Sequence, residues 1–294
     1  MSIIEDLKLQ FKIGGLTTKL IFWNIILFVV PAVVAAILKL FSIDVDYLHF
    51  VSLASSPSEL LWKPWSIITY SFFHAGLWHI IFNMLMLNFA GTLFMTFFTQ
   101  KQLLGLYFAG GIFAGIIYIL SYMFFPALIN INTALVGASA SIMAILFATV
   151  AYSPMMPVRL FIFGNLKLWH IALALIIIDL IQLPTNNTGG HLAHLGGAFF
   201  GYIYITQLRA GRDLVSWIGN IPVSVAALFN GNKKSTLKKV YQNYTPNATQ
   251  TQSKIIKKDR TQQQIDEILD KISKSGYDSL TKDEKEFLFR AGKQ

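Results

Sequence analysis

Cysteine is absent from this chain of 294 residues, and charge is scarce over most of its length. Without thiols there can be no disulfide, thiolate metal site or cysteine nucleophile. Residues 1–208 hold only 14 of the 39 charged side chains (24 Lys and Arg plus 15 Asp and Glu), and the other 25 lie in 209–294. So few charges over 208 residues exclude an ordinary soluble domain there. The first apolar run lacks a small-residue cleavage site and further runs follow it, so no cleavable signal peptide is predicted.

Long apolar runs take the place of the missing charges. A helix needs about 20 apolar residues to cross the hydrocarbon core of a membrane. Six stretches approach that length: 20–38, 77–98, 102–125, 135–152, 167–183 and 190–208. The sequence therefore predicts an all-α, multi-pass integral membrane protein, with a bundle of six transmembrane helices over residues 20–208.

The positions of the lysines and arginines predict how the spans are oriented. Positive residues occur before the first span, in the links after the second and fourth spans, and throughout the tail after the sixth. The other three links carry one lysine, Lys63, between them. Both termini are therefore expected in the cytoplasm, in what we interpret as a bacterial inner (plasma) membrane. The basic tail is expected to contact membrane lipids. Because no nucleic-acid motif accompanies it, no nucleic-acid partner is expected.

Four parts of the chain follow from these patterns. Residues 1–19 are predicted as a cytoplasmic N-terminal segment, 20–208 as the membrane domain, 209–264 as an interfacial helix and basic linker, and 265–294 as a small helical hairpin. Within the third part, the apolar stretch 214–229 is interpreted as lying along the inner surface. The hairpin is predicted because apolar residues after 265 share one helix face, and because Thr281 and Glu284 have the spacing of a capping box.

Polar side chains lie at one depth in three spans that enter from the outside. Each is one or two turns from that end, roughly 6–10 Å deep at ~1.5 Å per residue. They are His79 and Asn83 in the second span, Ser139 and Ser141 in the fourth, and His191 and His194 in the sixth. Gly197 and Gly201 form a GxxxG pattern that lets the sixth span approach the small residues of the fourth. A serine hydroxyl beside an imidazole is a minimal activated nucleophile.

Other interpretations of these polar residues exist. Interhelical hydrogen bonds would explain each of them separately. A zinc site of His79, His191 and His194 lacks the HExxH spacing and a nearby carboxylate, so no metal is predicted. A transporter would carry ionisable groups at the midplane rather than a shallow cluster on one side. Asp179 is interpreted as lying near the outer interface or a wet groove, not as a third member of a catalytic triad.

The order of the motifs HxxxN, GxS and HxxG over roughly residues 15–210 resembles the rhomboid intramembrane serine proteases. The resemblance implies that Ser139 is the nucleophile and His194 the general base, a dyad without a carboxylate. It implies an oxyanion hole from His79 and Asn83, with His74 near the site, and no cofactor. Two features differ from the usual family pattern: Ala140 follows the serine in place of glycine, and Trp65 is followed by serine rather than arginine.

The expected activity is hydrolysis of a peptide bond in or near a transmembrane segment of another membrane protein. Ser141 is expected to point to a different helix face and to pack. The alternative is an inactive rhomboid-like protein that binds transmembrane segments without cutting them.

Overall fold

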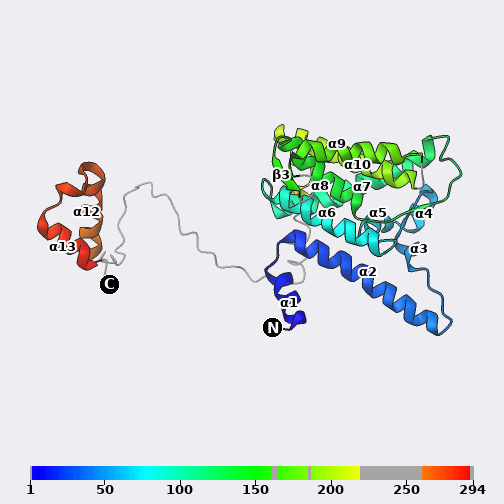
Figure 1. Ribbon diagram of the computed structural model, residues 1–294, viewed down its shortest axis with the longest axis horizontal. Coiled ribbons are helices and arrows are strands. Elements are labelled where there is room, and N and C mark those ends of the chain that lie inside the picture. Colours follow the sequence, from blue (N-terminus) through cyan, green and yellow to red (C-terminus); the bar gives the residue numbers. More distant parts are fainter. Residues whose placement is uncertain (1, 161–163, 185–186, 219–259, 292–294) are drawn as a thin grey trace, which may run out of the picture. The chain divides into compact units, whose positions relative to one another are not determined.

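The computed structural model describes residues 2–160, 164–184, 187–218 and 260–291. It divides into two compact units, residues 1–233 and 234–294. The described part of the first unit is mostly helical (Figure 1). Its elements are, in chain order, α1 (Ile3–Ile13), α2 (Leu16–Leu40), α3 (Tyr47–Val51), β1 (Leu53–Ala54), α4 (Pro57–Trp62), α5 (Ser66–Thr69), η1 (Tyr70–Phe72), α6 (Leu77–Met95), α7 (Gln100–Phe124), β2 (Ala134–Leu135), α8 (Ser139–Tyr152), β3 (Pro157–Leu160), β4 (Gly164–Lys167), α9 (Leu168–Gln182) and α10 (Thr188–Arg209).

Within the part of the chain that the structure describes, three helices are long and apolar enough to cross a membrane: α2 with 25 residues, α6 with 19 and α7 with 25. α8 and α9 are apolar but shorter. The length and apolar composition of these helices support the prediction that the chain is a membrane protein. The count of six spans is not confirmed by them and stays a prediction.

The fourth predicted span differs from the helix that the structure has. Its expected range is 135–152, but α8 begins only at Ser139. Fourteen residues of helix measure about 21 Å, which is less than the ~30 Å of the hydrocarbon core. Non-helical backbone is tolerated at membrane depth where it is buried in protein or lines a water-filled cavity. The segment before α8 meets the first condition, since Leu135 and Ala138 are both buried in the protein.

α8 is the central helix of the first unit. It contacts α6, α7, α9 and α10, and most of its side chains between Ala140 and Thr149 are buried. The contact with α10 depends on two glycines. A Cβ added to Gly197 would collide with the carbonyl oxygen of Ala140, and one added to Gly201 would collide with that of Ala144. The two backbones therefore touch directly, as the GxxxG pattern predicts.

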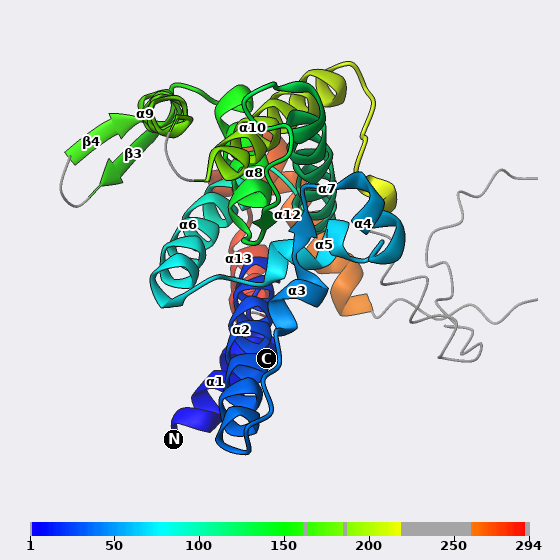
Figure 2. The ribbon, with the colours of Figure 1, turned by 90° about the vertical axis from the view of Figure 1, so that its right-hand side faces the viewer.

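Two short antiparallel strand pairs were not expected in an all-α fold. β1 pairs with β2, so that Leu53 lies opposite Leu135. This pairing ties the loop before α8 to the segment that follows α3. β3 pairs with β4, with Pro157 opposite Lys167. That second hairpin protrudes beside the start of α9 (Figure 2).

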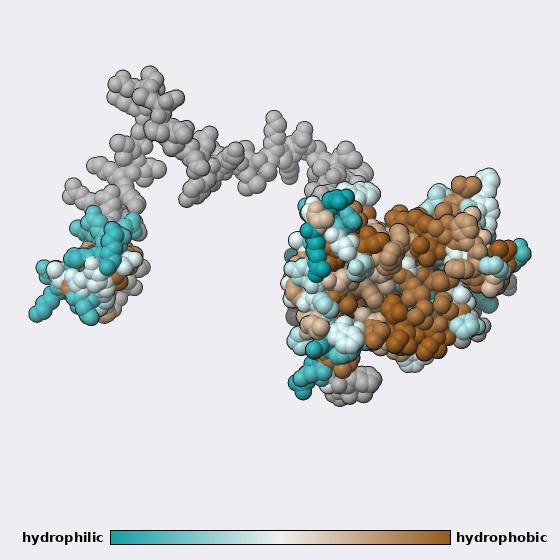
Figure 3. Space-filling view, turned by 90° about the horizontal axis from the view of Figure 1, so that it is seen from above, coloured by the Kyte–Doolittle hydropathy of each residue, from teal (hydrophilic) through white to brown (hydrophobic). Residues whose placement is uncertain are grey.

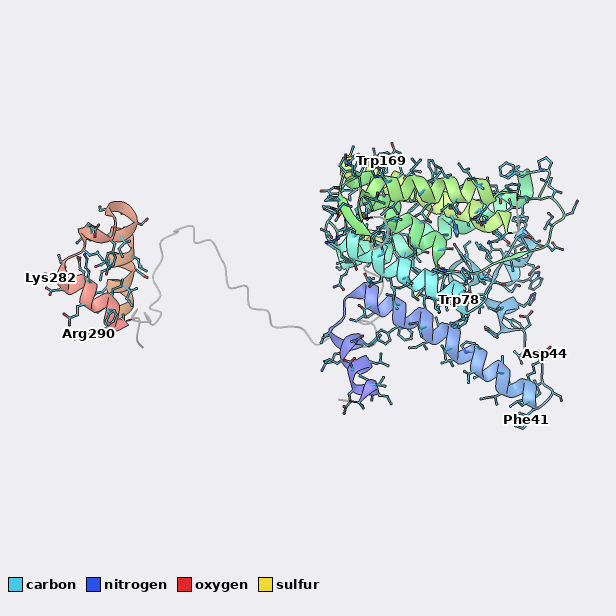
Figure 4. The ribbon with its side chains drawn as sticks, in the orientation of Figure 1. Phe41, Asp44, Trp78, Trp169, Lys282 and Arg290 are labelled. Carbon is cyan, nitrogen blue, oxygen red and sulfur yellow. The ribbon has the colours of Figure 1, made fainter. Side chains whose placement is uncertain are left out.

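The surface of the first unit fits a membrane environment. In the face that Figure 3 shows, hydrophobic residues gather over the middle of the unit and hydrophilic ones lie toward its edges. Trp78 and Trp169 are exposed near opposite ends of the helical bundle (Figure 4), where tryptophan typically marks the two membrane interfaces. α2 buries only residues of its N-terminal half, Thr17, Leu20 and Asn24, and the rest of the helix leans away from the bundle (Figure 1).

The described part of the second unit is a pair of helices, α12 (Arg260–Ser275) and α13 (Lys282–Ala291), joined by the 3-10 turn η2 (Tyr277–Ser279). The N–H of Thr281 donates to Glu284, and the N–H of Glu284 donates to the hydroxyl of Thr281, so the expected capping box is present. An ion pair of 2.9 Å between Lys271 and Glu284 joins the helices. The predicted interfacial stretch 214–229 and the basic linker lie mostly outside the described residues, which resume at 260.

Candidate active site

Ser139 is the first residue of α8, so the N-terminus of a helix lies directly at the serine. Gly137 sets up this arrangement. Its N–H donates to the carbonyl of Tyr70 at 2.9 Å, and its φ of +127° is rarely adopted by residues with a side chain. A Cβ at this position would also lie 2.8 Å from Nε2 of His79. Glycine is therefore required for the chain to turn into the helix this close to the histidine.

The start of α8 leaves backbone N–H groups available. The first helical hydrogen bond runs from the N–H of Ile142 to the carbonyl of Ala138, at 2.9 Å. The N–H groups of Ser139 to Ser141 precede it and have no acceptor within the helix. These groups, and the positive end of the helix dipole, favour a negative charge beside the serine.

The structure brings Ser139 and His194 together. Nε2 of His194, on α10, lies 2.6 Å from Oγ of Ser139. The two residues are 55 positions apart in the chain, and the backbone contact of α10 with α8 at Gly197 holds them at this distance. A ring nitrogen this close can accept the proton of the hydroxyl.

Asp179 completes a hydrogen-bonded cluster that the sequence interpretation did not include. Its side chain is buried, and one carboxylate oxygen, Oδ1, lies 2.9 Å from Nδ1 of His194 and 2.8 Å from Nδ1 of His191. From the sequence, Asp179 is interpreted as lying near the outer interface or a wet groove and not as a third member of a triad, whereas the structure brings its carboxylate into contact with His194. The signal that could have found it is an ionisable residue inside a predicted span, which marks a functional site by default.

His79 and Asn83 come from α6, and Asn83 lines the same pocket as Ser139. The backbone N–H of Ala75 donates to Nδ1 of His79 at 3.4 Å, so the neutral ring carries its own proton on Nε2. Nδ2 of Asn83 donates to the carbonyl of His79 at 2.8 Å. That bond uses one of the two amide protons and leaves the other for a ligand.

The hydroxyl of Ser141 and both ring nitrogens of His74 make no hydrogen bond to any described residue, so neither side chain is bonded to Ser139 or His194. The ring of His74 is buried and meets that of His79 edge to face, with 5.1 Å between centroids. Burial, helped by the neighbouring His79, lowers the pKa of His74 to about 3, so this ring is neutral. Ser141 is fully buried, and its hydroxyl faces the backbone of Gly111 on α7, where an added Cβ would lie 2.6 Å away.

A cavity of about 250 Å³ opens beside Ser139. Asn83, Asp179 and His194 contribute polar groups to its wall. The rest of the lining is mainly apolar and comes from α6, α8 and α9: Phe82, Met86, Ile142, Met143, Leu175 and Ile178. The cavity can therefore hold an apolar side chain next to the serine.

A family model described as the Rhomboid domain matches residues 61–211, slightly more than half of the chain. The chain belongs to the rhomboid family. The family predicted from the motifs is thus confirmed. A second model, a family of unknown function (DUF6576), matches residues 256–293 of the second unit.

Curated relatives of this rhomboid come from animals and a plant. Presenilin-associated rhomboid-like protein A, mitochondrial, of Danio rerio is 33% identical over 176 residues, which are 57% of this chain and 42% of the relative. RHOMBOID-like protein 12, mitochondrial, of Arabidopsis thaliana is 28% identical over 158 residues, 50% and 47% of the two chains. The rat presenilin-associated rhomboid-like protein, mitochondrial, is 31% identical over 175 residues, 56% and 42%. This rhomboid therefore spans less than half the length of these relatives.

The names of these relatives correct the predicted location. All three are described as mitochondrial, so the expectation of a bacterial inner membrane is wrong. The expectation rested on the distribution of positive residues, which orients spans but does not distinguish one membrane from another.

Asp179, His191 and His194 also form a group whose composition could hold a metal ion in this rhomboid. Their geometry fits hydrogen bonds better. Oδ1 lies 2.8–2.9 Å from each ring nitrogen, whereas the ligands of a tetrahedral zinc at about 2.0–2.1 Å stand about 3.4 Å apart. The group also differs from the zinc trio considered from the sequence, because the carboxylate takes the place of His79.

Proposed function

We propose that this rhomboid is an intramembrane serine protease that hydrolyses peptide bonds in or near the transmembrane segments of other membrane proteins. The observation that carries the proposal is the 2.6 Å contact between Oγ of Ser139 and Nε2 of His194 at a helix N-terminus. In this proposal six helices, α2 and α6 to α10, cross a lipid bilayer. The relatives' names make a mitochondrial membrane the proposed location.

The reaction begins with attack of Oγ of Ser139 on the carbonyl carbon of the substrate. The hydroxyl proton moves to Nε2 of His194, and the carbonyl oxygen becomes an oxyanion. The donors proposed to hold that oxyanion are Nε2–H of His79, the free amide proton of Asn83 and the backbone N–H groups at the start of α8. His194 then returns its proton to the leaving amine, and water releases the acyl group in the reverse sequence of steps.

An apolar substrate side chain fits the cavity between α6 and α9, because its wall is mainly apolar. A peptide bond in a membrane helix is shielded by its own hydrogen bonds. The substrate segment must therefore unwind locally before the carbonyl can approach Ser139. No cofactor has a role in this scheme.

The experiment for this proposal combines a probe with a cleavage assay. Ser139 in the purified, folded protein should react with a fluorophosphonate, and a reconstituted transmembrane substrate should be cleaved. Ser139→Ala and His194→Ala should each abolish cleavage, whereas the matched control Ser141→Ala should keep much of it. Absence of both labelling and cleavage in a folded sample would instead favour the alternative, a rhomboid-like protein that binds transmembrane segments without cutting them.

A further inference from the structure

We propose that Asp179 is a positioning residue for His194, and that His191 holds Asp179 in place through the same carboxylate oxygen. The proposal rests on the proposed function and changes its chemistry, because the dyad implied by the motifs becomes a triad with an additional histidine. The observation behind it is the pair of contacts at Oδ1, 2.9 Å to His194 and 2.8 Å to His191.

The carboxylate decides which nitrogen of His194 carries the proton. An ionised carboxylate can only accept hydrogen bonds, so Nδ1 of the neutral ring must be the donor. Nε2 then has a free lone pair facing Oγ of Ser139. Without the carboxylate, the ring could take the other tautomer, in which Nε2–H cannot accept the serine proton.

The same carboxylate acts once the proton has moved. When Nε2 takes the proton of Ser139, the ring becomes an imidazolium with a proton on each nitrogen. The negative charge of Asp179 stabilises that positive charge, and Asp179 does not itself take up a proton. The bond from Oγ to the carbonyl carbon forms while the Oγ–H bond breaks, so atoms and charge balance within the site.

His191 supplies a second hydrogen-bond donor to the buried negative charge of Asp179. An ionised carboxylate inside a membrane protein is costly unless donors satisfy it. His191 and His194 are three residues apart, so both rings lie on one face of α10, and each directs Nδ1 at the same oxygen. The hydrogen bond from His194 is needed for the reaction. The hydrogen bond from His191 holds the carboxylate in the position where His194 can donate to it.

A purely structural role is the competing explanation. Asp179 is one of three buried residues on α9, with Leu168 and Ala172, so its bonds to α10 could serve only to attach that helix. The two explanations differ in what they predict for Asp179→Asn, which keeps the shape and can still hydrogen-bond.

The kinetic test compares Asp179→Asn with the wild-type protein and with Asp44→Asn, an exposed carboxylate after α2. For Asp179→Asn we expect kcat to fall on the order of 10³- to 10⁴-fold with little change in KM, as when the aspartate of a serine-protease triad is replaced. His191→Ala should cost about ten- to a hundredfold, the range of a lost hydrogen bond to a charged group. Asp44→Asn should match the wild type. A kcat within a few fold of wild type for a folded Asp179→Asn would overturn the proposal.

A second measurement does not depend on activity or on any variant of Asp179. Nitrogen NMR of histidine-labelled wild-type protein in detergent reports the tautomer of each ring, and His194→Gln assigns the signal. We expect His194 to carry its proton on Nδ1. A proton on Nε2 would overturn the positioning role even if cleavage is observed. If His194 has the expected tautomer but no substrate is cleaved, the proposed protease function is wrong, whereas the role of Asp179 in orienting His194 is retained.

Discussion

At the scale of single residues, the chemistry of the site depends on which ring nitrogens carry protons. His194 and His79 have opposite arrangements. The carboxylate of Asp179 draws the proton of His194 to Nδ1, while the N–H of Ala75 leaves the proton of His79 on Nε2. One ring thus offers a lone pair next to Ser139 and the other offers a donor, as a base and an oxyanion-binding group require.

The donors proposed for the oxyanion give a prediction for α6. Asn83→Ala and His79→Ala should each lower kcat about a hundred- to a thousandfold, since that is the usual cost of removing one oxyanion-hole donor. Cleavage of a reconstituted substrate measures the effect. Asn88→Ala, an exposed asparagine on the same helix, is the control and should be unaffected. Near-normal rates for both site variants would mean that His79 and Asn83 only pack between helices and do not bind the oxyanion.

Ala140, where the family usually has glycine, gives a prediction of a different kind. Its methyl group is buried in a cluster with Leu53, Tyr70 and Ala193, away from the cavity. Ala140→Gly should therefore stay active but unfold more easily. The expected loss is about 0.8 kcal/mol for the buried methyl group and about 0.5–1 kcal/mol for glycine in a helix. Thermal unfolding checks the loss, and a large gain in activity would show that alanine impairs the site.

At the scale of elements, the contact of α8 with α10 determines whether Ser139 and His194 meet. His194 lies one turn before Gly197, which touches the backbone of α8 at Ala140. A change in the spacing of the two helices at Gly197 would therefore change the 2.6 Å distance between Nε2 of His194 and Oγ of Ser139.

Gly197→Ala should abolish most activity and lower the melting temperature. The added Cβ would collide with a carbonyl oxygen of α8, which cannot move aside as a side chain can. The control is the neighbouring Gly196→Ala, for which the three atoms nearest the added Cβ belong to the side chain of Ile117, at 3.0–3.2 Å. Cleavage assays and thermal unfolding of the two variants should differ strongly. Equal behaviour would mean that the α8–α10 contact does not set the geometry of the site.

What the sequence could predict at this scale follows from periodicity and residue size. The lengths of the apolar runs indicated α6, α7, α9 and α10 to within a few residues, and the small residues indicated the α8–α10 contact. The start of α8 was missed because residues 135–138 are as apolar as the helix. The pairing of β2 with β1 and the positive φ of Gly137 keep these residues out of the helix.

Asp179 was missed for a related reason. Its role depends on the placement of α9 against α10, and helix periodicity within α9 cannot report that placement. The carboxylate lies 12 residues from His191 and 15 from His194, beyond any local spacing rule. The motif resemblance, which implies a dyad, argued against it as well.

At the scale of the whole molecule, the position of the site relative to the bilayer follows from the order of the helices. Ser139 and His194 can meet near one membrane surface only if α8 and α10 run in the same direction. In the proposed six-span arrangement α7 and α9 then run the opposite way, and both ends of the membrane domain are expected on the face opposite the site. The exposed tryptophans Trp78 and Trp169 near the two ends of the bundle fit bilayer surfaces at those levels (Figure 4).

Single cysteines can test this topology without background, because the chain has none of its own. Cysteines at Asn132 and Asn187, both exposed in loops near the site, should react with an impermeant maleimide from one side of the membrane. Cysteines at Gln10 and Gln100, exposed near the opposite end, should react only from the other side, and one at Ser253 should follow them. Labelling of Ser253 with Asn132 would mean that the chain crosses the membrane once more after α10, which leaves the site intact. Labelling of Gln100 together with Asn132 would mean that α7 does not cross, and the six-span arrangement would have to be abandoned.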